Sequence, residues 1–163
     1  MPIHFVSGDL FDNAHGVRAF AHGCNCQGSM GAGVAKTFRS RYPEMYEEHR
    51  QRCKAEPRRF NLGDCWLWKA EDRPWVFNLG TQEGYWRSRA SYDAIEAALR
   101  RMREQADAED ISSIAMPRIG VRYGGLSWKE VRAIVESVFG DWPGTLVVYE
   151  EFVPGRMEAD PDR

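Results

Sequence analysis

The residues best suited to chemistry lie in the stretch 22–36, which combines several glycines with an asparagine and two cysteines. An apolar run precedes this stretch and a helix-like pattern follows it, so Gly28, Gly31 and Gly33 occupy a connection from a strand to a helix. Glycine lets backbone N–H groups approach an anion closely, and the first turn of a helix adds unsatisfied donors. The stretch therefore predicts a site for a phosphate-bearing ligand.

The spacing of these glycines matches neither of two common nucleotide motifs. The phosphate loop of nucleoside triphosphatases ends in Gly-Lys-Ser/Thr, and the dinucleotide fingerprint has a later acidic residue. Taken alone, the stretch is also compatible with a glycine-rich turn that only lets a helix pack tightly on a sheet. Other loops of the chain have to decide between these two interpretations.

Three further segments carry residues of the same kind. Asp9 follows a predicted strand, where its carboxylate can accept hydrogen bonds from the amino group of a base, although Asp after Gly commonly caps a turn. The segment 80–89 is polar and aromatic and also follows a strand, a position at which α/β domains carry specificity or chemistry. A second glycine-rich loop, 117–126, again runs from a strand into a helix.

The four cysteines are Cys24, Cys26, Cys53 and Cys65. They form neither paired Cys-x-x-Cys units nor a Cys/His framework with the usual zinc spacing. We therefore expect reduced thiols and no bound metal.

The composition is that of an ordinary globular protein, with 163 residues, 43% hydrophobic residues and a formal net charge of -2. A chain of this length builds a single core, and we expect one domain over residues 1–153 and a disordered tail over 154–163. The charge argues against a generally basic nucleic-acid-binding surface. No apolar run reaches the ~18 residues of a membrane span and no signal-peptide pattern is present, which predicts a cytoplasmic protein without a membrane partner.

The elements that must position the loops alternate along the chain. The patterns predict strands over 3–6, 17–21, 64–69, 75–79, 111–116 and 145–150, and helices over 34–52, 91–108 and 127–139. Pro43 should divide the first helical segment in two, and Ser127 with Glu130 predicts a capping box. An α/β sheet of this kind binds ligands outside the carboxyl ends of its strands, which favours a nucleotide-like ligand.

Four short segments carry a family pattern: Gly8–Leu10, Asn25–Ala35, Pro117–Gly120 and Gly124–Trp128. Together they resemble a macrodomain, of the branch that contains the terminal ADP-ribose protein glycohydrolase, the ALC-type macrodomains and the DNA ADP-ribosyl glycohydrolase antitoxins. The similarity covers nearly all of residues 2–150 and is most specific at Met-Gly-Ala-Gly-Val-Ala. It implies a three-layer αβα sandwich with a mixed central sheet that binds ADP-ribose in a crevice.

The resemblance also implies roles for individual residues. Asp9 takes the position of the family's contact to the adenine amino group, with Leu10 supplying backbone, and Asn25 faces the distal ribose. The first phosphate loop corresponds to Gly31, Ala32, Gly33 and Val34. The second phosphate loop corresponds to Gly120, Val121, Arg122, Tyr123 and Gly124.

Two positions depart from the family pattern. In the protein glycohydrolase of this branch, a lysine after the fourth strand attacks the distal ribose and an aspartate in the second phosphate loop assists. Here the lysine position, after Thr81, is Gln82, and the aspartate position is Gly124. Gln82 has no free amine, so a lysyl intermediate cannot form there. The antitoxin members also carry Gly-Gly-Leu in this loop, so the loss of the aspartate alone does not exclude activity.

Two functional classes stay open. The first is a hydrolase without a cofactor that releases mono-ADP-ribose from a macromolecule, with Gln82 and Asn25 holding a water at the anomeric carbon and Glu83 as a candidate base. The second is a reader that binds ADP-ribose without cleaving it, which needs only the loops and Asp9. The polar and cationic side chains of 81–89 favour the hydrolase.

The conjugate attached to ADP-ribose has two candidates. Acidic side chains of an ADP-ribosylated protein are our first choice, and a modified nucleic-acid base is the second. Trp86, Arg87 and Arg89 could stack on a base or contact a phosphate, which would favour nucleic acid, or they could pack on the following helix.

Overall fold

The computed structural model describes residues 2–84, 88–121 and 124–153, and these residues show the predicted alternation of strands and helices. The strands are β1 (Ile3–Gly8), β2 (Ala19–Asn25), β3 (Cys65–Trp68), β4 (Trp75–Gln82), β5 (Ser113–Pro117) and β6 (Thr145–Phe152). The helices are α1 (Gly33–Arg41), α2 (Pro43–Lys54), α3 (Tyr92–Ala108) and α4 (Trp128–Phe139), with a short 3-10 turn, η1 (Leu10–Asp12). The predicted tail 154–163 lies outside the described residues.

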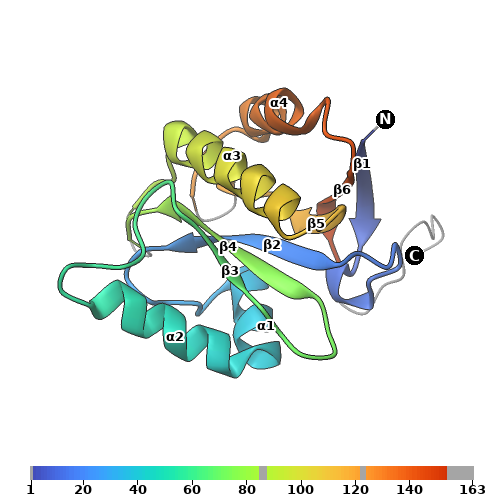
Figure 1. Ribbon diagram of the computed structural model, residues 1–163. Helices are drawn as coiled ribbons and strands as arrows, with labels where there is room; N and C mark the ends of the chain where they lie inside the picture. Colours follow the sequence, from blue (N-terminus) through green and yellow to red (C-terminus); the bar gives the residue numbers. More distant parts are fainter. Residues whose placement is uncertain (1, 85–87, 122–123, 154–163) are drawn as a thin grey trace.

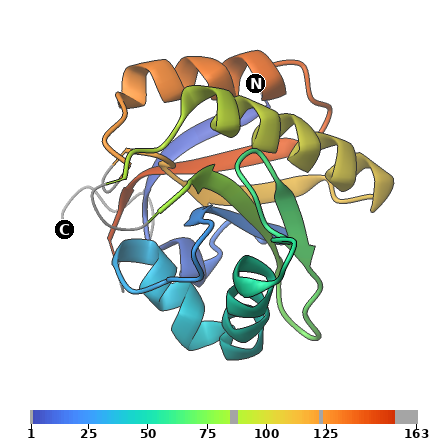
Figure 2. The ribbon, with the colours of Figure 1, turned by 90° about the vertical axis from the view of Figure 1, so that its left-hand side faces the viewer.

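The described strands form one mixed sheet in the order β1-β6-β5-β2-β4-β3. Neighbouring strands run parallel except for β3, which pairs antiparallel with β4 at one edge. Helices α3 and α4 cover one face of the sheet and α1 and α2 cover the other, as Figures 1 and 2 show. This arrangement confirms the predicted three-layer αβα sandwich.

Each helix layer buries its own apolar side chains against the sheet. On one face Ile95, Leu99 and Met102 of α3 are fully buried, and on the other Phe38 of α1 and Met45 of α2 are fully buried. Full burial of one such side chain stabilises the fold by about 1.5–3 kcal/mol. Two cores, one on each side of the sheet, therefore hold the strand ends and the loops that follow them in place.

The helix boundaries test two local predictions. Helix α1 ends at Arg41 and α2 begins at Pro43, which confirms the predicted break because proline fits the first helical position but not a helix interior. The predicted capping box of α4 is wrong, since the Ser127 side chain caps no N–H group. The hydroxyl of Tyr92 instead accepts the hydrogen bond from the Ser127 N–H, at 3.0 Å, and so takes the place expected for Glu130.

The neighbouring strands β2 and β4 extend further toward the loops than the sequence pattern indicates, as do β1 and β6. Strand β2 continues to Asn25 and β4 continues to Gln82, and these two residues are partners in the parallel ladder. The ladder continues past the last apolar side chains because backbone pairing does not require an apolar residue. As a result, two of the candidate site residues end neighbouring strands at the same edge of the sheet.

Candidate functional site

A cavity of about 520 Å³ opens at the carboxyl ends of the parallel strands. Its volume lies in the range of roughly 300–1,000 Å³ that is typical of small-molecule sites. The described lining residues are Gly23, Cys24, Asn25, Ser29, Met30, Gly31, Ala32, Gly33, Val34, Ala35, Thr81, Gln82, Pro117, Arg118, Ile119, Gly120, Val121, Gly124, Tyr149, Glu150, Glu151 and Phe152. Both predicted phosphate loops therefore face one cavity.

The first loop brings the N-terminus of α1 to the cavity wall. Gly33, the first residue of α1, has a φ of 62°, a left-handed conformation that glycine adopts without strain. Ala32 precedes the helix and has no side-chain oxygen that could cap it. The N–H groups of the first turn and the positive end of the helix dipole are thus available to an anion in the cavity.

The second loop closes on itself through backbone hydrogen bonds. Leu126 N–H donates to the Gly120 carbonyl at 2.9 Å, and Ala90 N–H donates to the Gly124 carbonyl at 2.8 Å. A Cβ atom at Gly124 would lie 2.6 Å from the Gly120 oxygen and 2.7 Å from the Ala90 Cβ, closer than such atoms can approach. An aspartate therefore does not fit at this position without a shift of the loop. Arg122 and Tyr123 lie outside the described residues.

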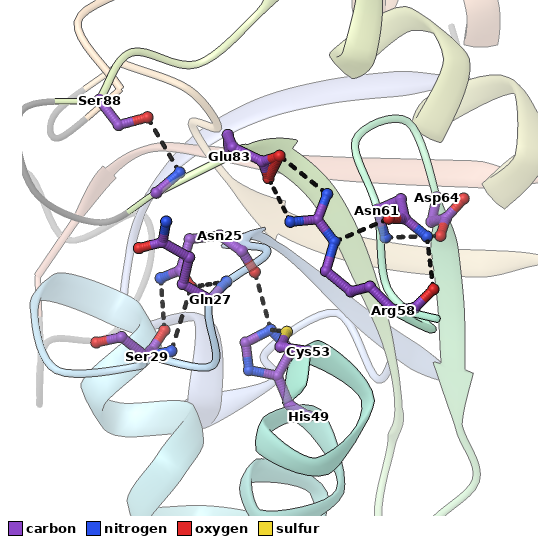
Figure 3. Close-up of polar contacts among 11 residues, drawn as sticks. Asn25, Gln27, Ser29, His49, Cys53, Arg58, Asn61, Asp64, Glu83 and Ser88 are labelled. Carbon is purple, nitrogen blue, oxygen red and sulfur yellow. Dashed lines mark hydrogen bonds and ion pairs between the residues drawn. The ribbon is translucent and has the colours of Figure 1, made fainter. Parts of the chain in front are cut away.

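Asn25 lines the cavity and also organises the first loop. Its Oδ1 accepts hydrogen bonds from Gln27 N–H at 3.0 Å and Ser29 N–H at 3.2 Å, and its Nδ2 donates to the Ser29 carbonyl at 2.7 Å (Figure 3). These three contacts fold the chain after β2 into the compact turn that begins the loop. One hydrogen of the Asn25 Nδ2 is used in this way, and the amide carries a second.

Gln82 lies beside Asn25 at the end of β4 and is 9% exposed. Its Nε2 donates a hydrogen bond to the Ser88 carbonyl at 2.8 Å, which fixes the side-chain amide in the cavity wall. The position at which the resemblance places a catalytic lysine is therefore occupied by a neutral amide, which is held in place by its hydrogen bond to Ser88. Trp86 and Arg87, which follow in the same loop, lie outside the described residues.

Glu83 is not among the described residues that line the cavity. Its carboxylate is exposed and forms an ion pair with Arg58, with N–O distances of 2.8 and 2.9 Å, and Arg58 Nε also donates to Asn61 Oδ1 (Figure 3). The pair ties the end of β4 to the connection between α2 and β3. The structure thus brings Asn25 and Gln82 together but does not bring Glu83 into the cavity with them.

Asp9 and Leu10 likewise lie outside the lining of the cavity. Asp9 Oδ1 accepts a hydrogen bond from Phe11 N–H at 2.9 Å and so caps η1, and Leu10 is fully buried in the core. The preceding residue, Gly8, pairs with Phe152 of β6, which does line the cavity. Asp9 is therefore a turn cap that stands next to one end of the cavity.

Sequence reasoning missed the end of β6 and the Cys24 side of the cavity. Glu150, Glu151 and Phe152 line it because β6 runs parallel to β5 in the middle of the sheet, so the two strands end at the same edge. The signal that could have found them is the apolar strand 145–150 itself, followed by its polar continuation. Burial raises the pKa of the Cys24 thiol well above its ordinary value, so this thiol forms part of the wall and is a poor nucleophile.

In residues 2–84, 88–121 and 124–153, no three His, Cys, Asp or Glu side chains gather as the ligands of a metal ion would. None of the helices in these ranges combines the length and apolar character that crossing a bilayer requires.

Comparison with known families agrees with the observed fold. The family model described as Macro domain matches residues 21–135. The chain belongs to the macrodomain family. The match includes both predicted phosphate loops, whose described residues line the cavity in this macrodomain.

The curated relatives of this macrodomain include proteins with different names. The chain is 30% identical over 151 residues to a DNA ADP-ribosyl glycohydrolase of Mycobacterium tuberculosis. This match covers 90% of this chain and 42% of the relative. It is 26% identical to an ADP-ribose 1''-phosphate phosphatase of Meyerozyma guilliermondii, and this match covers 83% of this chain and 93% of the relative. The chain therefore spans about two fifths of the first relative and nearly the whole of the second.

Among solved structures, the macrodomain of Mycobacterium tuberculosis DarG matches this chain with a TM-score of 0.81 and 30% identity. The match covers 90% of this chain and 96% of that chain. The similarity thus extends over the whole sandwich rather than over the loops alone.

Proposed function

We propose that this macrodomain binds ADP-ribose and releases mono-ADP-ribose from modified macromolecules by directing a water to the anomeric carbon. The observation that carries the proposal is the single cavity in which the N-terminus of α1, the second glycine-rich loop and the amides of Asn25 and Gln82 meet. The names of the relatives, which refer to ADP-ribosyl and ADP-ribose substrates, support the same ligand.

The cavity offers a place for each part of ADP-ribose. The pyrophosphate fits between the α1 N-terminus and the loop at Gly120, where backbone N–H groups and the helix dipole favour negative charge. The adenine then lies toward Phe152 and the nearby Asp9, and the distal ribose lies toward Asn25 and Gln82 at the ends of β2 and β4. No cofactor is required for this binding.

In the proposed reaction, the oxygen of a water attacks the anomeric carbon while the bond from that carbon to the leaving group breaks. The carbonyl oxygen of the Gln82 amide accepts a hydrogen bond from this water, and the proton that the water loses passes to a phosphate oxygen of the substrate. Because the amide is held by Ser88, the water is oriented before the reaction begins. Glu83, paired with Arg58 outside the cavity lining, is the weaker candidate for a base.

The same geometry favours an acidic protein side chain as the conjugate. A carboxylate departs with its electron pair at neutral pH and needs no proton, whereas a poorer leaving group requires a general acid. Near the distal ribose, the described lining residues Asn25, Thr81 and Gln82 include no carboxylic acid, lysine or histidine. A site of this kind is better suited to an ester of a glutamate or aspartate than to a less reactive linkage.

The relatives provide two alternative substrates. The glycohydrolase relative, by its name, acts on ADP-ribosylated DNA, and its similarity covers 90% of this chain. The phosphatase relative, by its name, acts on ADP-ribose 1''-phosphate, and it is matched over 93% of its length. Both substrates carry their substituent at the anomeric position of the distal ribose, but a glycohydrolase cleaves the bond to the anomeric carbon and a phosphatase cleaves the P–O bond.

The proposal is tested by offering three substrates to the protein: glutamate-ADP-ribosylated protein, ADP-ribosylated DNA and ADP-ribose 1''-phosphate. Released ADP-ribose is measured for each, together with the affinity for free ADP-ribose by calorimetry. We expect binding of ADP-ribose and release from the protein ester. Binding without release from any substrate would leave a reader, and absence of binding would remove both functions.

A further inference from the structure

His49 of α2 holds the end of the strand from which the first loop begins. Its side chain is fully buried, and its Nε2 lies 3.0 Å from the carbonyl oxygen of Asn25 (Figure 3). Because a carbonyl can only accept, the imidazole must carry its hydrogen on Nε2. A helix on one face of the sheet therefore makes a directed contact with the edge of the cavity.

The peptide between Asn25 and Cys26 is held by a hydrogen bond at its carbonyl and by another at its N–H group. The carbonyl of the peptide between Asn25 and Cys26 accepts from His49, and the N–H of the same peptide donates to the Glu83 carbonyl at 3.1 Å. Rotation of this plane would have to break both bonds. Since the Asn25 side chain folds the turn that follows, the orientation of the plane determines the orientation of the loop.

The surroundings of His49 indicate that the hydrogen bond, not packing, is what the imidazole adds. Phe60 packs edge-on against the ring, with a centroid distance of 5.2 Å. The Nδ1 atom is buried, and the described residues offer it no hydrogen-bond partner. A leucine would fill the same space without burying an unpaired Nδ1, which carries an energetic cost, but it could not donate to the Asn25 carbonyl.

The packing of α2 against the loop supports the same assignment. A Cβ atom at Gly28 would lie 3.1 Å from the Cα of Arg50, so the loop lies directly on the helix one residue beyond His49. Burial lowers the pKa of His49, and this effect outweighs the opposing effect of its hydrogen bond to Asn25. The lowered pKa favours the neutral ring, which has a single N–H group. The helix and the loop thus form one rigid support for the cavity.

We infer that His49 is a positioning residue for the ADP-ribose site, which acts through the Asn25 peptide and the turn that Asn25 organises. The inference rests on the proposed function for its ligand. His49 touches neither the cavity nor the ligand, and its effect is to keep the first-loop N–H groups directed at the pyrophosphate and the Asn25 amide directed at the distal ribose.

The experiment compares three variants by calorimetry with ADP-ribose and by hydrogen exchange of the loop amides in the free protein. His49→Leu removes the N–H donor, and His49→Gln supplies an amide donor of similar reach. The control, Tyr42→Phe, removes a partly buried hydrogen bond of 2.8 Å from Tyr42 to the Pro74 carbonyl, and neither of these residues lines the cavity. We expect His49→Leu to weaken ADP-ribose binding about tenfold or more, the size of one lost hydrogen bond.

The same variant should speed the exchange of Gln27 and Ser29 N–H groups, while His49→Gln restores both readouts to near the wild-type values. Tyr42→Phe should lower thermal stability without changing either. Unchanged affinity and unchanged exchange in folded His49→Leu would overturn the role of His49, as would a failure of His49→Gln to recover any of the loss. Wild-type protein that holds its loop amides protected but binds no ADP-ribose would instead overturn the proposed function.

Discussion

Two glycines of the first loop place different demands on a side chain. Gly33 has a positive φ, so any other residue there strains the backbone whatever space the cavity offers. Gly31 has no such constraint, and a Cβ atom there would meet only Ser29 Oγ, at 3.6 Å, an ordinary contact. Gly31 is therefore the position at which the ligand site can be blocked without disturbing the fold.

We predict that Gly31→Glu abolishes measurable ADP-ribose binding, because its carboxylate would occupy the phosphate region and repel the ligand. Gly31→Ala is the matched control and should bind with little change, since its methyl group fits. Calorimetry measures the affinity, and thermal unfolding confirms that both variants are folded. Normal binding by Gly31→Glu would show that the first loop is not the phosphate site.

Gln82 supports a prediction about the reaction. Gln82→Ala should lower the rate of ADP-ribose release by about 10²-fold, in the range for a lost electrostatic or positioning contact, with little effect on ADP-ribose affinity. Borohydride added during turnover of the wild type should trap no lysyl adduct, since no lysine occupies this position. Single-turnover kinetics provides the rate, and full activity of the variant would exclude Gln82 from the mechanism.

A pair of buried polar side chains, His22 and Asn78, links strands β2 and β4 beneath helix α1. His22 of β2 is fully buried, stacks on Phe38 of α1 with a centroid distance of 4.0 Å, and its Nε2 lies 2.8 Å from Asn78 Oδ1 of β4. Burial lowers the pKa of His22 from 6.5 to about 3, with the Asn78 hydrogen bond opposing the shift. The imidazole of His22 is therefore neutral in the folded protein at pH 7.

This imidazole should make the fold sensitive to acid. Below pH 6.5 the unfolded chain binds a proton at His22 that the folded protein does not bind until about pH 3, so stability falls as the pH falls through this window. The limiting slope for one group is about 1.4 kcal/mol per pH unit. The free energy of unfolding, measured with urea at several pH values between 7 and 4.5, should depend less steeply on pH in His22→Gln than in the wild type. His4→Gln, which removes an exposed imidazole, should show the same pH dependence as the wild type.

The elements show how far the sequence could predict the fold. Apolar patterns located the strands and helices and Pro43 located the helix break, because these features depend on neighbours in the chain. The capping box failed because Tyr92, more than thirty residues away in sequence, provides the acceptor for Ser127. The roles of Asn25 and Glu83 could not be predicted fully for the same reason, since their partners in the fold decide whether an amide or a carboxylate faces the cavity.

At the scale of the whole molecule, the cavity joins the two helix layers. The loop into α1 and the loop between β5 and α4 both line the cavity. Helices α1 and α4 cover opposite faces of the sheet (Figure 1). The sheet separates the two cores, and both cores contribute residues to the cavity lining. A bound ligand should therefore stabilise the sandwich as a unit.

We predict that ADP-ribose at 100 times its dissociation constant raises the free energy of unfolding by about 2.7 kcal/mol, the value expected when only the folded state binds. Thermal unfolding should show a single transition that moves upward with ligand concentration. Adenine alone, which lacks the phosphates, should give a much smaller shift. A second transition that does not respond to ADP-ribose would show that one layer unfolds independently of the site.

The crowding at Gly124 limits what a change of sequence can do to the chemistry of this macrodomain. A lysine could replace Gln82 by a single substitution, because both side chains are long and unbranched, but an aspartate at 124 would collide with the Gly120 oxygen. The two substitutions therefore differ in what they require, since a lysine at 82 needs no change of backbone whereas an aspartate at 124 needs a shift of the loop. A protein engineer who wants the lysyl pathway must therefore rebuild the backbone around Gly120 and Gly124 as well as replace Gln82.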